Sequence, residues 1–443
     1  MHANWSHKSL AELGREINAG RISPVDLAEA HLDAIADHPL ADRIFARATA
    51  ARARAEAMAA HGRARTGQRR SLIDGVPISW KDNVDTAGVA TEAGSALLKG
   101  RIPARDAEVL VNATLMGLVC LGKTHLSELA FSGLGLNPGT ATPPCINDDR
   151  AVAGGSSSGA AASVAHGLAP AAIGTDTGGS VRIPAAWNDL VGLKTTAGRL
   201  SIKGIVPLCD SFDSVGPLAR NVEDCAHLLA ALEGVRPIDL SGSSLAGMRF
   251  LVLDSVALDD LRDRPGQGFE DALKRLSAAG ARLETAEVPA VAEAMALAPI
   301  LFTAEAYALW RSVIEAAPDK MFPPILERFR SGAAHKAVDH IAAWRRLAQL
   351  RADWAAAVAP YDAVLVPTAP ILPPDAARLL TDAAYYASEN LLALRNTRIA
   401  NLMGNCALTL PTAQPSCGIS FMAPAGAEEK LLRIGAAAEA ALR

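Results

Sequence analysis

Short apolar runs recur along the chain and alternate with longer segments that carry helix signals. Runs of this length are typical of buried strands, because a strand covered on both faces needs no polar positions. The strands expected from this pattern are 76–80, 118–121, 248–254, 281–287, 363–366, 407–410 and 418–422. Residues 160–173 read as a buried helix that runs into a further strand. The alternation predicts an α/β protein whose central mixed, twisted β-sheet is covered on both faces by α-helices.

Capping residues mark the expected helices. Ser9 with Glu12, and Ser23 with Pro24, predict two helices that open the chain. Further helices are expected at 44–62, about 105–116, 221–234, 268–279 and from about 427 onward. The polar connector 235–247 has predicted strands on both sides, so we expect one large domain over 1–443. Its expected parts are N-terminal helices at 1–65, a catalytic core at about 66–235 and a variable part at about 236–443.

The composition argues against several classes of function. The 443 residues are half hydrophobic and carry a formal net charge of -4, so no basic face is expected and nucleic acid is not an expected partner. Six cysteines without a CxxC pair indicate reduced thiols, with neither a metal site nor a disulfide framework. No signal-peptide pattern opens the chain, and no uninterrupted apolar run reaches the ~18 residues of a membrane span. We therefore expect a soluble cytoplasmic protein without a membrane partner, metal or cofactor.

One motif matches a nucleotide-binding pattern. Residues 117–124 read GLVCLGKT and fit the GxxxxGK[ST] signature of a phosphate-binding loop. Such a loop turns its backbone amides toward phosphates, whereas the four intervening residues here are apolar and read as a strand. We therefore reject the nucleotide site and interpret Lys123 as a strand-end residue near the site.

Two serine-glycine turns are the most informative feature for chemistry. Residues 153–159 read AGGSSSG and residues 174–184 read GTDTGGSVRIP, with a mostly apolar segment between them. Consecutive glycines allow a tight turn that aims backbone N–H groups at a developing oxyanion, which makes Ser180 a candidate nucleophile. From this segment alone, an ordinary helix entry explains the glycines equally well.

A serine nucleophile needs a base, and lysine is the remaining candidate. His125 and His166 lie in or beside apolar segments, where most histidines are structural. Lys81 follows the predicted strand 76–80 and can act as a neutral base when it is desolvated. Lowering its pKa from ~10.4 to near 7 costs about 4 to 5 kcal/mol, so a dry pocket is required. A lysine at a surface strand terminus is the alternative interpretation.

Together these residues resemble the amidase signature family of hydrolases. The blocks at 153–159 and 174–184 are similar to the two serine blocks of that family, and 75–82 (GVPISWKD) resembles its lysine block. Downstream, 211–220 (SFDSVGPLAR) and 366–370 (VPTAP) extend the resemblance over nearly the whole chain. Residues 187–189 and Thr195 depart from the family pattern, so packing behind Ser180 is expected to differ.

The resemblance implies a hydrolase of carbon–nitrogen bonds other than peptide bonds, acting on linear amides, with ureas or carbamates as alternative substrates. Such an enzyme works through an acyl-enzyme and releases ammonia or an amine from a small amide. Ser180 is the implied nucleophile, Ser156 the bridging serine on a cis peptide and Lys81 the general base. The implied oxyanion-hole residues are Thr177, Gly178 and Gly179. The residues implied to hydrogen-bond around them are Ser157, Asp176 and Arg182. A homodimer is expected on the same ground.

Sequence indicates the substrate less clearly than the chemistry. The candidate pocket residues are Phe131, Trp80, Phe302, Tyr307, Trp310 and Arg395. The glutaminase subunits of tRNA-dependent amidotransferases, within the same family, carry an acid in an Asp-x-Phe-Thr element that binds an ammonium. The matching segment here, 394–397, reads LRNT, and an aliphatic side chain cannot pair with an ammonium.

This difference favours a free-standing amidase, similar to biuret-type and aryl-amide hydrolases, over the glutaminase subunit, which remains the alternative. An inactive binding or scaffold homologue is a second alternative. It is disfavoured because Lys81, Ser156 and Ser180 are all retained.

Overall fold

An eleven-stranded sheet forms the centre of the computed structural model, which describes residues 5–443. The strands lie in the order β1-β3-β2-β6-β8-β7-β12-β13-β11-β9-β10. Their bounds are β1 Phe45–Ala48, β2 Pro77–Lys81, β3 Val119–Thr124, β6 Ala171–Asp176, β7 Val191–Lys194, β8 Ser214–Ala219, β9 Arg249–Leu253, β10 Arg282–Ala286, β11 Ala363–Pro367, β12 Cys406–Pro411 and β13 Gly418–Ala423. A separate hairpin consists of β4 (Pro144–Cys145) and β5 (Asp148–Val152).

The sheet is mixed. β2 runs parallel to β3 and β6, and β9 runs parallel to β10 and β11, whereas neighbours such as β6 and β8 or β12 and β13 are antiparallel. Strands from before and after the connector 235–247 belong to the same sheet, because β7 pairs with β12. The predicted α/β fold with a large mixed sheet is confirmed.

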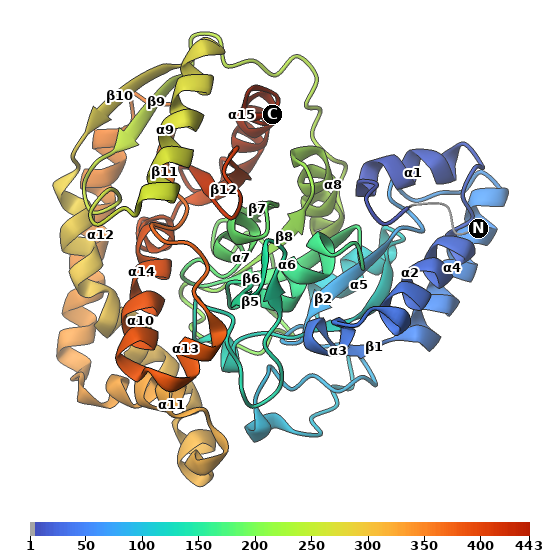
Figure 1. Cartoon of the computed structure of the whole chain (residues 1–443), viewed down its shortest axis with the longest axis horizontal. Helices are drawn as coiled ribbons and strands as arrows, with labels where there is room; N and C mark the ends of the chain where they lie inside the picture. Colours follow the sequence, from blue (N-terminus) through green and yellow to red (C-terminus); the bar gives the residue numbers. More distant parts are fainter. Residues whose placement is uncertain (1–4) are drawn as a thin grey trace.

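Helices flank this sheet along its whole length (Figure 1). They are α1 Leu10–Asn18, α2 Pro24–Asp37, α3 Ala41–Ile44, α4 Ala50–Arg65, α5 Glu108–Leu115, α6 Ser158–Ala165, α7 Arg182–Trp187, α8 Val222–Glu233, α9 Asp263–Ala278, α10 Pro289–Ala316, α11 Pro323–Arg330, α12 Ala337–Val358, α13 Ala376–Thr381, α14 Ala383–Leu402 and α15 Glu428–Leu442. In Figure 1 the helices α1, α2 and α4 lie at the right, and α10, α11 and α12 lie at the left.

The capping signals are confirmed. Ser9 and Glu12 form a complete capping box at α1, and the Ser23 side chain accepts from the Val25 amide at α2. The single helix expected at 44–62 is wrong, because 45–48 form β1 and α4 begins only at Ala50. β1 can pair closely with β3 since Gly122 carries no side chain, and a Cβ there would lie 2.5 Å from the Arg47 carbonyl oxygen. Residues 119–124 are buried strand, which supports the rejection of a phosphate loop.

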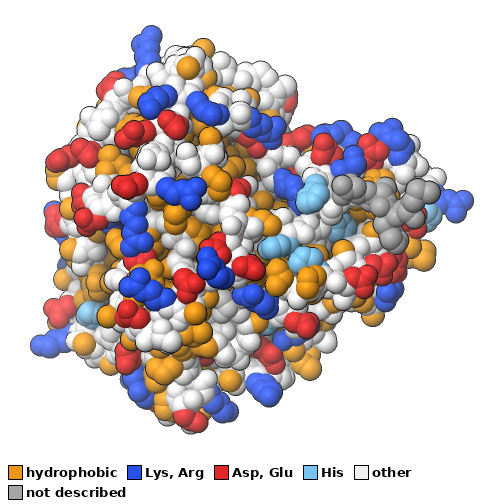
Figure 2. All heavy atoms as spheres, viewed as in Figure 1, with side chains coloured by type: hydrophobic (Ala, Val, Ile, Leu, Met, Phe, Trp, Pro, Cys, Tyr) orange, Lys and Arg blue, Asp and Glu red, His pale blue; other side chains and the backbone are white. Residues whose placement is uncertain are grey.

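Apolar side chains fill both faces of the sheet. One cluster joins strand residues such as Ile78 and Phe421 to α8 and α15, and the other joins Val364 and Met422 to α10, α12 and α14. By length and composition alone, α10 is a weak candidate for a membrane span. It packs against α11, α12 and α14, and 44% of its most apolar 18-residue window is buried. On the face shown in Figure 2, acidic and basic side chains are interspersed.

Candidate active site

Lys81 lies at the end of β2 and is completely buried. Its Nζ atom is 2.7 Å from Ser156 Oγ and 2.8 Å from Thr175 Oγ1. Burial lowers the pKa of Lys81 to about 7, although the carboxylates of Asp213 and Asp176 act in the opposite direction. The neutral amine is therefore well populated near neutral pH, which is the state that a general base requires.

The first serine block, residues 153–159, brings Ser156 beside this amine. Ser156 is fully buried, the peptide bond between Gly155 and Ser156 is cis, and α6 begins two residues later at Ser158. A Cβ on Gly155 would lie 2.5 Å from the Gly135 amide, so only glycine fits at this position. The next residue, Ser157, donates its amide to the Ser180 carbonyl (3.2 Å) and its hydroxyl to the Thr175 carbonyl (3.2 Å). The two serine blocks are thereby tied to each other.

Ser180 stands in the turn between β6 and α7 and is only 4% exposed. Within residues 5–443 its hydroxyl forms no hydrogen bond, and the residue lines a narrow pocket of about 20 Å³. Gly179, just before it, has φ +139°, and a Cβ there would lie 2.1 Å from Thr397 Oγ1. Thr397 in turn donates its hydroxyl to the Gly178 carbonyl at 2.7 Å. A glycine is therefore required both by the backbone conformation and by the close approach of α14.

A buried ion pair holds this turn in place. Both oxygens of Asp176 accept from the Arg182 guanidinium (2.9 and 3.0 Å), and Oδ1 also accepts from the Asn401 amide (3.0 Å). The Arg182 guanidinium lowers the pKa of Asp176 well below its usual range, against the opposing effect of burial. The same carboxylate accepts from the Gly179 amide at 2.8 Å. The Gly179 N–H thus has a protein acceptor in this structure, and its donation to an oxyanion stays a prediction.

Other donors remain available beside Ser180. The backbone amides of Thr177, Gly178 and Ser180 have no protein acceptor among residues 5–443, and all three residues line the narrow pocket. The Thr177 hydroxyl donates to the carboxylate of Asp213 through a short hydrogen bond. That carboxylate also accepts from the Leu208 amide at 2.9 Å, and burial raises its pKa to about 6. Asp213 therefore holds the Thr177 side chain beside Ser180 and contributes negative potential at Lys81.

Comparison with known proteins identifies the family. The family model described as Amidase matches residues 26–432. A 2-amino-5-chloromuconic acid deaminase of Comamonas testosteroni is 35% identical, with 99% of this chain and 96% of that protein aligned. One subunit of the glutamyl-tRNA(Gln) amidotransferase of Acidothermus cellulolyticus is 33% identical, over 98% of this chain and 94% of its own length. The chain belongs to the amidase family.

Solved structures agree with this assignment. The crystal structure of an amidase superposes with a TM-score of 0.88 at 28% identity, covering 98% of this chain and all of the other. The peptide amidase of Stenotrophomonas maltophilia superposes with a TM-score of 0.80 at 27% identity, covering 99% of this chain and 98% of the other. The protein is accordingly a hydrolase of the amidase signature family that acts on carbon–nitrogen bonds other than peptide bonds.

The expected pocket residues of this amidase fall into two groups. Phe131 and Phe302 line the narrow pocket with Ser180. The other four do not: Trp80 is buried in the sheet core, and Trp310 is buried with its Nε1 donating to the Pro207 carbonyl (2.9 Å). Tyr307 donates its hydroxyl to Glu315 at the surface, and Arg395 donates to the Ala257 carbonyl (3.3 Å). Side-chain type alone suggested these four. The directions of Tyr307, Trp310 and Arg395 depend on α10 and α14, which the sequence pattern did not define, and Trp80 points into the core from strand β2.

Several residues at the site were not predicted. Thr175 contacts the amine, Asp213 holds Thr177, and Thr397 and Asn401 reach the turn from α14. Leu394, which the sequence comparison had singled out, lines the pocket. Asp213 lies inside the block 211–220, so that block was a usable signal. The arginines of the pocket, Arg328 on α11 and Arg398 on α14, had no sequence signal. In residues 5–443, no group of three or more His, Cys, Asp or Glu side chains is arranged to hold a metal ion.

Proposed function

We propose that the amidase hydrolyses a small amide through a Ser180–Ser156–Lys81 relay. Ser180 Oγ attacks the amide carbonyl carbon while its proton passes to Ser156, and the Ser156 proton passes to the neutral Lys81 amine. The oxyanion forms beside the amides of Thr177, Gly178 and Ser180, whose hydrogen atoms have no other acceptor within residues 5–443. The proton returns along the same path to the departing nitrogen, and water then hydrolyses the acyl-enzyme. The products are a carboxylate and ammonia or an amine.

The observation that carries this proposal is the state of the Lys81 amine. It is buried, its pKa is lowered to about 7, and it lies 2.7 Å from the hydroxyl of Ser156. A charged lysine in the same place would hold the serine in position but would not accept its proton. The hydrogen bond from the Ser157 amide to the Ser180 carbonyl supports the assignment of both serine blocks to one site.

The test combines turnover with covalent labelling. Ser180→Ala is expected to abolish both ammonia release and labelling by a fluorophosphonate probe. Lys81→Ala and Ser156→Ala are expected to reduce both by several orders of magnitude. Ser243→Ala, at a serine that bonds only to the Leu240 carbonyl in the connector, is the matched control. Full labelling of Ser180→Ala would refute the assignment of the nucleophile. Absence of labelling in the wild type would favour an inactive homologue.

A glutaminase subunit is the second candidate, because the similarity to the amidotransferase component extends over 98% of the chain. Leu394 favours a free-standing enzyme. This aliphatic side chain lines the pocket, where the ammonium group of glutamine would need an acidic partner. Purified protein should therefore release little ammonia from glutamine. Glutamine turnover that requires a second protein component would reverse the preference. Several expectations stay predictions. They are a small-molecule amide substrate, a cytoplasmic location, a homodimer, and the absence of a cofactor and of nucleic-acid or membrane partners.

A further inference from the structure

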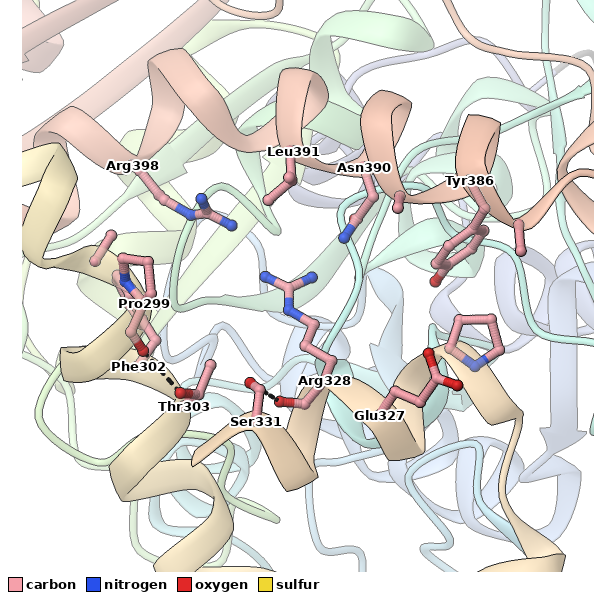
Figure 3. Close-up of a pocket in the computed structure, with 14 residues that line it drawn as sticks. Pro299, Phe302, Thr303, Glu327, Arg328, Ser331, Tyr386, Asn390, Leu391 and Arg398 are labelled. Atoms are coloured by element: carbon pink, nitrogen blue, oxygen red, sulfur yellow. Dashed lines mark hydrogen bonds between the residues drawn. The ribbon is translucent and has the colours of Figure 1, made fainter. Parts of the chain in front are cut away.

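A larger cavity adjoins the narrow pocket that contains Ser180. Its volume is about 400 Å³, and α10, α11 and α14 supply its walls (Figure 3). Phe302, Arg328 and Arg398 line both the cavity and the narrow pocket, so the two spaces meet at these side chains. A substrate whose reacting carbon lies at Ser180 therefore has its wider part beside two arginines.

Both guanidiniums point into the cavity, Arg328 from α11 below and Arg398 from α14 above (Figure 3). Arg328 donates to the Phe131 carbonyl at 2.9 Å and stacks over the Phe131 ring at 4.4 Å. Arg398 lies over the Phe302 ring at 6.0 Å. Within residues 5–443, neither side chain forms an ion pair with Asp or Glu. By contrast Arg330, two residues from Arg328, is paired with Glu315 at 2.7 Å.

Two buried guanidinium groups without a counter-charge are unfavourable in free energy. Burial lowers the pKa of Arg328 to about 10, and it lowers the pKa of Arg398 to about 9 with a contribution from the positive charge of Arg328. Guanidinium groups are recognition elements for carboxylates, because their N–H donors match both oxygens. An anion between the two arginines would remove the repulsion and provide the missing acceptors.

A neutral donor faces the same space. The Asn390 side chain is buried, and its oxygen accepts from the Gly133 amide (2.8 Å) and the Ser132 hydroxyl (3.1 Å). Its amide nitrogen has no acceptor among the described residues and is turned toward Arg328 (Figure 3). The Glu327 carboxylate lies on the Tyr386 side of the cavity, away from the Arg398 guanidinium (Figure 3). Three donor groups thus face the same cavity, and two of them, Arg328 and Arg398, also line the narrow pocket.

We infer that Arg328, Arg398 and Asn390 bind a carboxylate on the acyl part of the substrate. This inference rests on the proposed function and narrows the substrate to monoamides of small dicarboxylic acids. The pocket at Ser180 is narrow, which suits ammonia as the leaving group and puts the acyl chain in the larger cavity. Water adds its hydroxyl to the acyl carbon and its hydrogen to the nitrogen, so the products are a dicarboxylate and ammonia.

The kinetic test uses matched substrates. Ammonia release is measured for the monoamides of malonic, succinic, glutaric and adipic acids, each beside the neutral amide of the same chain length. At least one monoamide is expected to exceed its neutral partner in kcat/KM by about tenfold or more. Arg328→Gln and Arg398→Gln should each reduce this ratio by about tenfold, mainly through KM, whereas Arg330→Gln on the same helix should leave the ratio unchanged. Equal ratios in all four proteins would overturn the inference.

A binding measurement separates the two proposals. Calorimetric titration with succinate, glutarate and adipate should show binding to the wild type and to Ser180→Ala, and weaker binding to Arg328→Gln and Arg398→Gln. Arg→Lys variants at both positions, with far-ultraviolet circular dichroism, check that any loss is not misfolding. Arginine-dependent binding without turnover of any amide would leave the anion site standing while the hydrolytic proposal fails. Turnover without a carboxylate preference and without dicarboxylate binding would support the hydrolytic proposal and refute the anion site.

Discussion

The lowered pKa of Lys81 allows a quantitative prediction of how the free energy of unfolding changes with pH. In the folded protein the pKa of Lys81 is about 7, whereas its ordinary value, expected in the unfolded chain, is 10.5. Between these values the unfolded chain binds a proton that the folded protein does not bind. The free energy of unfolding therefore rises with pH through this window. The linkage relation gives a gain of about 3 to 4 kcal/mol between pH 7 and pH 10 from this one group.

Lys81→Met removes the titrating group while nearly preserving its volume. The variant loses the hydrogen bonds to Ser156 and Thr175, which costs about 1 to 3 kcal/mol at every pH. The variant also avoids the free-energy cost of burying an amine. At pH 7 we therefore expect the inactive variant to be at least as stable as the wild type. At pH 10 we expect it to be less stable.

Urea unfolding at pH 7, 8, 9 and 10 measures the difference between the two proteins. Lys203→Met, at a lysine whose side chain is 86% exposed, serves as the control and should show no comparable change with pH. In parallel, kcat/KM of the wild type should rise with pH through about 7 as the base loses its proton. A difference in unfolding free energy that is constant from pH 7 to pH 10 would refute the argument for a neutral lysine.

Three further substitutions test the supports of the site. Asp213→Asn removes a carboxylate that raises the pKa of Lys81, so the acid limb of the kcat/KM profile should move to lower pH; an unchanged or higher limb contradicts this. Asp176→Asn leaves the Arg182 guanidinium buried without its counter-charge and should lower the free energy of unfolding by about 3 to 5 kcal/mol, measured in urea. Gly179→Ala should abolish turnover through contact with Thr397, whereas Gly62→Ala, in the open interior of α4, should stabilise by about 0.5 to 1 kcal/mol and leave kinetics unchanged.

Local signals explain what could be predicted from the sequence. The caps at Ser9 and Asn221 depend on neighbouring residues, and the buried strands β2, β3 and β11 depend on continuous apolar runs. Both kinds of signal lie within a few residues and need no tertiary information. Strand β1 lacked such a signal, since its four residues read as the start of the alanine- and arginine-rich helix that follows. These residues form a strand because they pair with β3, which lies far from them in the sequence.

The proposed catalytic residues could be predicted from local sequence signals, whereas the larger cavity could not. Lys81, Ser156 and Ser180 stand in blocks whose glycines are required by close contacts, such as Gly155 against Gly135. Those blocks were visible because the glycines and serines are concentrated in short segments. The cavity instead consists of single side chains from α10, α11 and α14, helices that the apolar pattern did not delimit. Unpaired arginines such as Arg328 become recognisable only when their surroundings are known.

One helix face connects these two parts of the enzyme. Asn390, Leu394, Thr397 and Asn401 are spaced by four, three and four residues, so they lie on one side of α14. Along this side, Asn390 holds the Gly133 amide, Leu394 lines the pocket, Thr397 holds the Gly178 carbonyl and Asn401 holds Asp176. Arg398, which faces the larger cavity, follows Thr397 directly. A shift of α14 that changed the cavity would therefore also move the turn that carries Ser180. Substrate preference in this enzyme is expected to change through side chains such as Arg398, while the helix itself stays in place.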